Sequence, residues 1–257
     1  MRGIGIIGVG EIGRAMVEGL CDGTEEAPPV NLSPRGARTS AELAARHPNV
    51  RVRADNQGVV DSSDIVIIAV RPRGYAEALA GLKVGGDRIV VSVVAGVPAE
   101  ALRRVLGTDA PVVRAIPLPA VRERGSVTVT CPAHPAVDAL FDRLGGALPV
   151  ADEAEFDVFS ALTGTLTSHY WYLATLAEWA GRHGVEAADA DRYVRGLFQG
   201  LGRSLGDGSR SLRRLAADHE TPNGSNERIR TTWFDEANAT ALTEALDGLL
   251  DHLRQGW

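Results

Sequence analysis

The residues most suited to chemistry stand at the start of the chain, in a glycine-rich turn. The turn reads Gly8-Val9-Gly10-Glu11-Ile12-Gly13 and follows a strand-like run over residues 3–7. In such a turn the first glycine allows a tight exit from the strand, the second lets backbone approach a pyrophosphate, and the third lets the next helix pack against the sheet. Free N–H groups at the positive end of that helix would hold the anion. The spacing predicts a dinucleotide site with contacts at Gly8, Gly10, Glu11, Ile12 and Gly13.

The segment after the second expected strand distinguishes the two nicotinamide cofactors. An acidic residue there would bind the adenosine ribose hydroxyls and favour NAD. The sequence has no acid over residues 31–38 and places Ser33 and Arg35 where the 2′-phosphate of NADP would lie. A guanidinium can bind a phosphate through two parallel hydrogen bonds, and the Ser33 hydroxyl adds a neutral donor. NADP is therefore the expected cofactor and NAD is less favoured; the alternative is that Arg35 is a solvated residue in a turn.

Two more turns follow expected strands, at the edge of the sheet where open α/β folds bind ligands. One contains Val70, Arg71 and Pro72, and the other contains Ala95 and Gly96. Pro72 would stiffen its loop, and Gly96 would permit close approach to the cofactor. We expect these five residues to bind the cofactor, with Arg71 over its ribose and phosphates, although Arg71 is also compatible with a simple surface position.

The elements that must position these turns alternate between strand and helix over the first 150 residues. The clearest strand is 64–70, whose continuous β-branched run is typical of a parallel strand buried on both faces. Strands are expected at 4–7, 30–33, 50–53, 64–70, 89–94, 112–116, 126–130 and 148–150, and helices at 12–20, 39–46, 75–82, 98–106 and 136–144, with Ser40 as a possible helix cap. This alternation predicts an α/β fold with a doubly wound Rossmann sheet.

The pattern changes after Ala151, where strand signals disappear and amphipathic helical stretches follow. Helices are expected at 153–182, 187–205, 211–218 and 238–253. The first of them is too long and apolar to be covered by one small layer, so it is expected to pack against a second copy of itself or a partner subunit. The sequence thus predicts a dinucleotide-binding domain over 1–151 and an all-α dimerisation and substrate domain over 152–257.

Composition excludes several classes of partner. A formal charge of −6 without a basic stripe argues against nucleic acid or an anionic membrane surface. Cys21 and Cys131 do not suggest a disulfide framework, and the six histidines lack metal-ligand spacing, so no metal is expected. No signal peptide or membrane-length apolar run is evident. The expectation is a cytoplasmic enzyme acting on a small molecule.

Together these features resemble the pyrroline-5-carboxylate reductase family over nearly the whole chain. The resemblance rests on the glycine turn, Ala69-Val70-Arg71-Pro72, residues 92–96, Arg114-Ala115-Ile116-Pro117, Gly125, Leu144-Gly145, and residues 161–165 and 221–226. It implies a Rossmann domain and a helical dimerisation domain, NAD(P)H as hydride donor, a cyclic imino acid as acceptor, and a place in proline biosynthesis. It also implies an active site assembled between two chains, with Pro117 at the cofactor.

The departures from the family pattern fall on the side of the hydride acceptor. Leu118 replaces an Asn that lies near the nicotinamide in the family. The small-residue segment gains Leu166 and an ionisable His169. Asn226 replaces a Thr that contacts the substrate ring nitrogen and carboxylate in the family, and Asn223 replaces a Gly while tolerating positive φ. The substrate is therefore less determined than the cofactor.

Reduction of an imine needs a hydride at carbon and a proton at nitrogen. An iminium substrate would need no general acid, only orientation and an anchor for a carboxylate, which backbone N–H groups around Gly224–Asn226 and the Ser225 hydroxyl could supply. For a neutral imine or a ketone, His169 is the best proton donor, since its ordinary pKa is near 6.5, and Tyr170 is the runner-up. Alternatively His169 is only a packed residue of an aromatic-rich helix.

The residues expected at the substrate are few. They are Leu118, Thr163, Thr165, Gly224, Ser225 and Asn226. The two threonine hydroxyls have a second interpretation, because a helical hydroxyl often bonds back to a preceding carbonyl.

The leading hypothesis is thus an NADPH-dependent reductase of pyrroline-5-carboxylate or a related cyclic imine. One alternative is a Rossmann-plus-helical dehydrogenase of a 2-oxo or 3-hydroxy acid, a class that usually relies on a Lys in the helical domain; this chain has no Lys after Lys83. The other is a non-catalytic NADP-binding dimer, which a pocket filled by Leu118 and Leu166 would favour.

Overall fold

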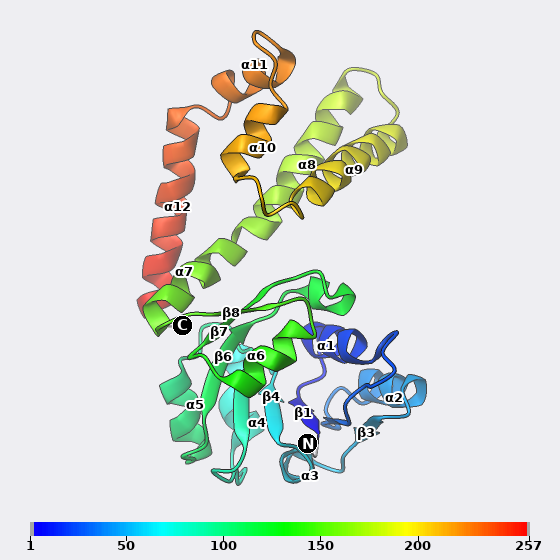
Figure 1. The fold of residues 1–257 in the computed structure, drawn as a ribbon, viewed down its shortest axis with the longest axis vertical. Helices are drawn as coiled ribbons and strands as arrows, with labels where there is room; N and C mark the ends of the chain where they lie inside the picture. Colours follow the sequence, from blue (N-terminus) through cyan, green and yellow to red (C-terminus); the bar gives the residue numbers. More distant parts are fainter. Residues whose placement is uncertain (1–2, 256–257) are drawn as a thin grey trace. The chain divides into compact units, whose positions relative to one another are not determined.

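The sheet that carries the predicted cofactor turns has eight strands (Figure 1), in a computed structural model that describes residues 3–255. Its order is β3-β2-β1-β4-β5-β6-β7-β8. All neighbours are parallel except β6 and β7, which are antiparallel. The strands are β1 (Ile4–Ile7), β2 (Val30–Leu32), β3 (Val50–Val52), β4 (Ile65–Ile68), β5 (Ile89–Ser92), β6 (Val112–Ile116), β7 (Thr128–Cys131) and β8 (Ala147–Pro149). The predicted fold class, a Rossmann sheet followed by a helical region, is confirmed.

Apolar side chains of the central strands pack on both faces of the sheet. On β4, Ile65 and Ile67 belong to the cluster formed with α1 (Glu11–Cys21) and α6 (Pro135–Asp142), whereas Ile68 belongs to the cluster formed with α4 (Tyr75–Leu79) and α5 (Ala99–Leu106). Successive side chains of a strand point to opposite faces, so a strand covered on both faces must be apolar throughout. Burial on both faces explains why the β-branched run over residues 64–70 is continuous.

Helices and 3-10 segments connect the strands. Besides α1, α4, α5 and α6, they are α2 (Ala37–Arg46), α3 (Asn56–Asp61), η1 (Pro72–Gly74) and η2 (Pro119–Glu123). The helix α3 was not expected; it is short and capped by the Asp55 carboxylate, which accepts from the Gly58 N–H. Ser40 is inside α2 rather than at its start, and its buried hydroxyl donates to the carbonyl of Ser33 at 3.0 Å.

The chain after β8 is entirely helical. It contains α7 (Glu153–Thr163), α8 (Thr165–Arg182), α9 (Ala187–Ser204), α10 (Leu212–Asp218), α11 (Ser225–Thr232) and α12 (Glu236–Gln255). The expectation of one helix over 153–182 is wrong, because the helix is interrupted at Gly164. A Cβ at Gly164 would lie 2.7 Å from Leu249 Cδ2, so the missing side chain lets α12 pack closely at the interruption. The helices α8 and α9 pack side by side (Figure 1).

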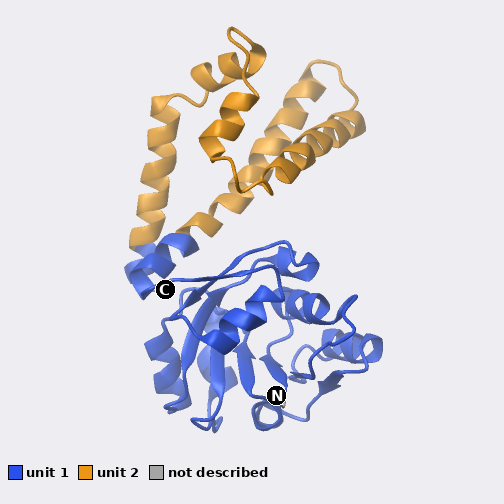
Figure 2. Cartoon of the chain, viewed as in Figure 1, with its two compact units in different colours: residues 1–160, 252–257 blue, residues 161–251 orange. Residues whose placement is uncertain are grey.

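Two compact units divide the chain (Figure 2). The first extends to Ser160 and includes the chain from His252, and the second spans Ala161–Asp251. The division therefore falls inside α7, whereas the change from mixed to all-helical elements falls after Ala151, as expected. The assignment of a dimerisation and substrate role to 152–257 stays a prediction. Within residues 3–255 no helix is long and apolar enough to span a membrane.

A nearly buried carboxylate, Glu18 on α1, joins three segments of the first unit. Arg14 Nε lies 3.0 Å from Glu18 Oε1, Arg46 Nη1 of α2 lies 3.4 Å from the same oxygen, and Arg122 Nε of η2 lies 2.5 Å from Oε2. Burial alone would raise the pKa of Glu18, but the hydrogen bond from Arg14 and the charges of Arg122 and Arg14 lower it below its ordinary value of 4.5. The carboxylate is thus held in its ionised form.

The lowered pKa of Glu18 predicts a specific loss of stability in acid. A group whose pKa is lower in the folded state stabilises the fold above its unfolded pKa, and this contribution disappears as pH falls through the folded pKa. We expect Glu18→Gln to reduce the free energy of unfolding by about 1–3 kcal/mol at pH 7. The difference from the original chain should shrink below pH 4.5. Urea denaturation at several pH values measures this, with the exposed Glu77→Gln as control; a difference independent of pH would contradict the assignment.

Candidate functional site

The glycine turn has the geometry that the sequence predicts at two of its three glycines. Gly8 has φ 96°, and a Cβ there would lie 2.7 Å from the carbonyl oxygen of Ala69 at the end of β4. A Cβ at Gly13 would lie 2.7 Å from the carbonyl oxygen of Gly8. Both glycines are therefore required by the packing of the turn itself.

Gly10 differs from these two because no protein atom lies within 4 Å of a Cβ built on it. Gly10 is the N-cap of α1 and offers no side-chain cap, so the first N–H groups of the helix have no side-chain partner there. Glu11 is exposed and Ile12 is half-buried in the first turn. Open space in front of free helical N–H groups is what an approaching pyrophosphate requires.

Ser33 does not have the role expected from the sequence. Its side chain has no exposed surface, and its hydroxyl accepts a hydrogen bond from the Gly8 N–H at 3.0 Å. The residue therefore holds the glycine turn against the end of β2 and is not available to a 2′-phosphate. The expectation failed because a hydroxyl after a strand satisfies a buried N–H as readily as it binds a ligand.

Arg35 lies on the surface beside the glycine turn. The turn after β2 passes close to the turn after β1, since a Cβ at Gly36 would lie 3.3 Å from the carbonyl oxygen of Val9. Gly36 has φ 92° and caps α2 without a side chain. Arg35 is exposed, and the first acid after β2 is Glu42, which pairs with Arg38 at 2.9 Å. A cation and a free helix start suit an added phosphate, so these residues fit NADP.

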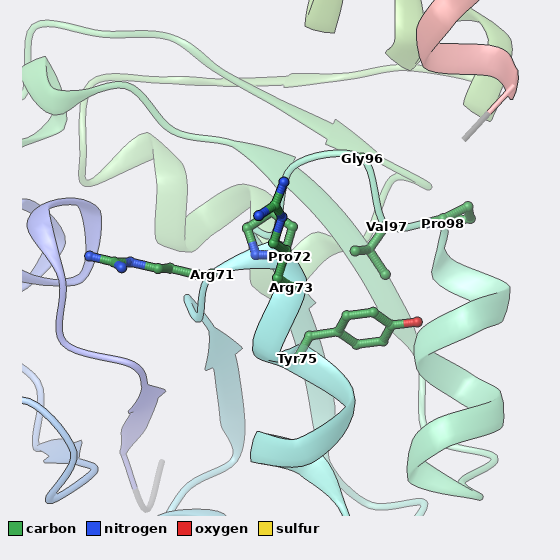
Figure 3. A pocket seen from close by; sticks show the side chains of 7 residues that line it. All are labelled: Arg71, Pro72, Arg73, Tyr75, Gly96, Val97 and Pro98. Carbon is green, nitrogen blue, oxygen red and sulfur yellow. The ribbon is translucent and has the colours of Figure 1, made fainter. Parts of the chain in front are cut away.

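The turns after β4 and β5 share a cavity of about 740 Å³. The predicted residues Arg71, Pro72 and Gly96 all line it, and Gly96 has φ 69°. Figure 3 shows the Arg71 side chain extending away from Tyr75, while the Tyr75 ring points toward the start of α5. Val70 is half-buried and Ala95 is exposed beside these residues. Four further lining residues follow the two turns and were not among the predicted site residues: Arg73, Tyr75, Val97 and Pro98.

The segment after β6 is attached to the helix that starts at the glycine turn. Pro117 is buried and Leu118 is half-buried where η2 begins. Gly19 of α1 allows the close contact, since a Cβ there would lie 2.3 Å from the carbonyl oxygen of Val121. Arg122 also pairs with Glu11 at 3.1 Å. The backbone around Pro117 is thereby held by the same helix that would bind the pyrophosphate.

A buried arginine on β6 pairs with two acids of α7. The Arg114 side chain is 8% exposed, forms an ion pair with Glu153, and lies 3.6 Å from Asp157 Oδ1. Its guanidinium also lies 4.2 Å from the ring centroid of Phe156. Glu153 begins α7, the first helix after β8. No local signal pairs it with a strand 39 positions earlier.

His169 in the second unit lies in an aromatic cluster. Its ring packs edge-on against Phe198 at 5.8 Å and is tilted toward Tyr172 at 6.4 Å. Tyr172 in turn stacks on Trp233 with a 5.2 Å centroid distance. His169 is nevertheless exposed, as is Tyr170. The packing role that competed with catalysis thus has direct structural support, while a role in proton transfer stays a prediction.

The two threonines near Gly164 differ in their surroundings. Thr165 donates its hydroxyl hydrogen bond to the carbonyl oxygen of Leu162 at 2.7 Å, the back-bonding that competes with substrate contact. Thr163 is half-buried, and Leu166 is 45% exposed. Substrate contact at either threonine stays a prediction.

The 221–226 segment begins α11 and is not simply a loop. Asn223 adopts φ 60°, as its residue type allows, and Gly224 is the N-cap. Asn226 donates from Nδ2 to the carbonyl oxygen of His219 at 2.7 Å, and Ser225 is exposed. Across residues 3–255 no group of three or more His, Cys, Asp or Glu could hold a metal ion.

Comparison with known proteins adds a family to this geometry. Residues 3–96 match the family model described as NADP oxidoreductase coenzyme F420-dependent. The chain is 28% identical to pyrroline-5-carboxylate reductase of Corynebacterium melassecola, over 88% of this chain and 87% of the relative, and 27% identical to the Pseudomonas aeruginosa enzyme, over 87% and 85%.

Solved structures agree on the fold over the whole length. A pyrroline-5-carboxylate reductase from Coxiella burnetii superposes with a TM-score of 0.81 at 20% identity, covering 98% of this chain and 97% of that one. The Plasmodium falciparum enzyme with NADP bound has a TM-score of 0.77 at 14% identity, covering 98% and 97%. The chain is thus similar to pyrroline-5-carboxylate reductases along most of its length, at 27–28% identity to the Corynebacterium melassecola and Pseudomonas aeruginosa relatives, and shares the fold of the solved ones.

Proposed function

We propose that the protein is an NADPH-dependent reductase of a C=N bond, in pyrroline-5-carboxylate or a related cyclic imine. The observation that supports NADPH as the cofactor is the open space at Gly10 beside the exposed Arg35. No acidic residue stands between the end of β2 and Glu42. The relatives named pyrroline-5-carboxylate reductase support the reaction. A reductive aminase from Aspergillus terreus, solved with NADPH, supports the cofactor and shares the fold at a TM-score of 0.62, 16% identity and coverage of 98% of this chain and 92% of that one.

The residues of the first unit bind and orient the cofactor. When bound, NADPH supplies the hydride that reduces the C=N carbon. The N–H groups at the start of α1 would hold the pyrophosphate, and Arg35 would pair with the 2′-phosphate. The cavity at Arg71 and Gly96 would receive a further part of the cofactor, since ligands of open α/β sheets lie outside the carboxyl ends of the strands.

The proton that imine reduction requires depends on the form of the substrate. An iminium brings its own proton, so the protein then contributes position alone. A neutral imine takes its proton from a donor within reach, for which His169 and Tyr170 are the candidates. The dehydrogenase alternative gains no support, since the helical region has no Lys.

A direct assay tests the proposed function. Purified protein is mixed with NADPH and, in separate reactions, with 1-pyrroline-5-carboxylate, a panel of cyclic imines and a panel of 2-oxo acids, and NADPH absorbance is followed. Turnover of at least one imine is expected. Tight NADPH binding without turnover of any imine would favour the non-catalytic dimer, and turnover of 2-oxo acids alone would favour the dehydrogenase.

Arg35→Ala tests the choice of cofactor. Loss of a charge-assisted phosphate contact should raise the Kd for NADPH by about 10–100-fold while changing the weaker binding of NADH little. Fluorescence titration with each cofactor gives the Kd for NADPH and the Kd for NADH in the variant and in the original chain. Arg104→Ala, an exposed arginine on α5, is the matched control. Equal losses for NADPH and NADH would show that Arg35 does not contact the 2′-phosphate.

The exposed apolar side chains of the second unit support the predicted homodimer. The buried apolar residues of this unit are few, whereas Tyr170 is 72%, Trp171 68%, Tyr193 73% and Leu212 73% exposed. Monomeric proteins rarely expose so many large apolar side chains on one set of helices. Covering them with a second copy matches the resemblance, which places the active site between two chains.

Trp171→Glu tests this assembly. A charge placed in a desolvated interface should shift the protein from dimer to monomer and abolish turnover if the site is shared. Light scattering after gel filtration gives the mass, and Glu178→Gln on the same helix is the control. A monomeric original chain with full activity would contradict the proposal. The cytoplasmic location stays a prediction.

A further inference from the structure

The first turn of α11 carries a carboxylate of its own. Glu227 is half-buried, and its Oε2 accepts a hydrogen bond from the Asn223 N–H at 2.6 Å. The contact resembles one half of a capping box, because an acid in the first turn binds an N–H that precedes the helix, while the N-cap Gly224 has no side chain to form the other half. The partial positive charge of the helix start is thus already met by an anion from within the chain.

The donors expected to anchor a substrate carboxylate here are partly engaged. The Gly224 N–H donates to the carbonyl oxygen of Thr221 at 2.8 Å, in a turn so tight that a Cβ at Gly224 would lie 2.3 Å from Thr221 Oγ1. The side-chain amide of Asn226 is also engaged, since its Nδ2 donates to the carbonyl oxygen of His219. The remaining N–H groups of the first turn could receive a substrate carboxylate only beside that of Glu227.

The Glu227 carboxylate at this helix start disfavours a substrate with an acid group beside it. Glu227 lines a cavity of about 480 Å³ with Arg228 and the polar residues Asn223, Gly224, Thr231 and Thr232. A carboxylate beside Glu227 would meet a like charge, which costs free energy at short range, whereas an iminium would meet an opposite charge. Arg228 is the group in the same cavity that could instead pair with an acid.

We propose that Glu227 makes this reductase select cyclic imines that carry no carboxylate, such as 1-pyrroline, over imino acids. The inference rests on the proposed reduction of a C=N bond and on the family resemblance that makes 221–226 the substrate loop. It narrows the class of substrate proposed for that site. Where the loop would bind the carboxylate of an imino acid, it already binds the carboxylate of Glu227.

A comparison of two substrates tests the inference. The intact protein with NADPH should show kcat/KM for 1-pyrroline roughly tenfold or more above that for 1-pyrroline-5-carboxylate. In Glu227→Gln the ratio of the two kcat/KM values should fall at least about fivefold, chiefly because kcat/KM for 1-pyrroline-5-carboxylate rises. Gln retains an acceptor for the Asn223 N–H, so the helix start is preserved while the charge is lost. Glu186→Gln removes another capping carboxylate, at the start of α9, and should leave the ratio unchanged.

The outcomes separate this inference from the proposed function. Turnover of neither substrate nor any other imine removes the proposed function and the inference with it. Turnover of both, with the acid preferred or with a ratio that Glu227→Gln does not move, leaves the proposed function standing and overturns the inference. Arg228→Ala identifies the cause in that case, because a selective loss of activity on 1-pyrroline-5-carboxylate would show that Arg228 is the acid anchor.

Discussion

Gly10→Ala is expected to weaken NADPH binding by roughly tenfold or more while changing the free energy of unfolding by less than about 1 kcal/mol. The backbone at Gly10, with φ −85° and ψ −159°, is open to alanine, and the added methyl group meets no protein atom within 4 Å. The methyl group would instead occupy the space through which the pyrophosphate approaches the N–H groups of α1. Cofactor titration and urea denaturation measure the two quantities separately.

Two other glycine variants serve as comparisons for Gly10→Ala. Gly13→Ala should lower the free energy of unfolding by about 1–3 kcal/mol, because its Cβ would lie 2.7 Å from a carbonyl oxygen that cannot move freely. Gly86→Ala, in a turn with open space around it, should change neither quantity. Full NADPH affinity in a folded Gly10→Ala protein would place the pyrophosphate elsewhere.

Arg114→Ala is expected to lower the free energy of unfolding by about 3 kcal/mol. The guanidinium is 8% exposed, pairs with Glu153 and Asp157, and packs on the Phe156 ring. Its removal leaves Asp157, 19% exposed, without that partner in a partly desolvated place and also removes the packing on the ring.

A matched arginine provides the control for Arg114. Arg103 and Arg114 both line a cavity of about 430 Å³. Arg103 is 41% exposed and lies 3.9 Å from Glu100, so Arg103→Ala should cost less than about 0.5 kcal/mol. Adding Asp157→Asn to Arg114→Ala should cost less than the sum of the single changes, because the carboxylate has already lost its partner. Additive losses would show that the two side chains do not interact.

Much of the first unit could be predicted because its signals are local. A continuous apolar run such as Ile65–Ile68 identifies a strand covered on both faces, and the spacing of Gly8, Gly10 and Gly13 identifies the turn that follows β1. The turns at Arg71 and Gly96 line one cavity because parallel strands end at the same edge of the sheet, which is where the sequence placed both turns. The antiparallel direction of β7 had no such signal, since an apolar strand pairs in either direction.

The helical half was harder to predict because its signals depend on partners distant in sequence. Gly164 interrupts the expected long helix where α12 packs against it, and Leu249, the residue in contact, is 85 positions later. The capping carboxylate of Glu227 looks like any exposed acid until the Asn223 turn brings an N–H to it. The aromatic contacts of His169 with Phe198 likewise arise from the packing of α8 against α9.

By itself the sequence determined the fold class, the glycine turn and the absence of an acid after β2, because backbone freedom, hydrophobic period and side-chain charge are properties of short segments. Tertiary structure alone decided which polar groups are engaged: Ser33 on the Gly8 N–H, Arg114 on two acids of α7, and Asn226 on the His219 carbonyl. The physical reason is that a buried donor or acceptor takes whichever partner the fold brings within reach, and that partner stands far away in the chain.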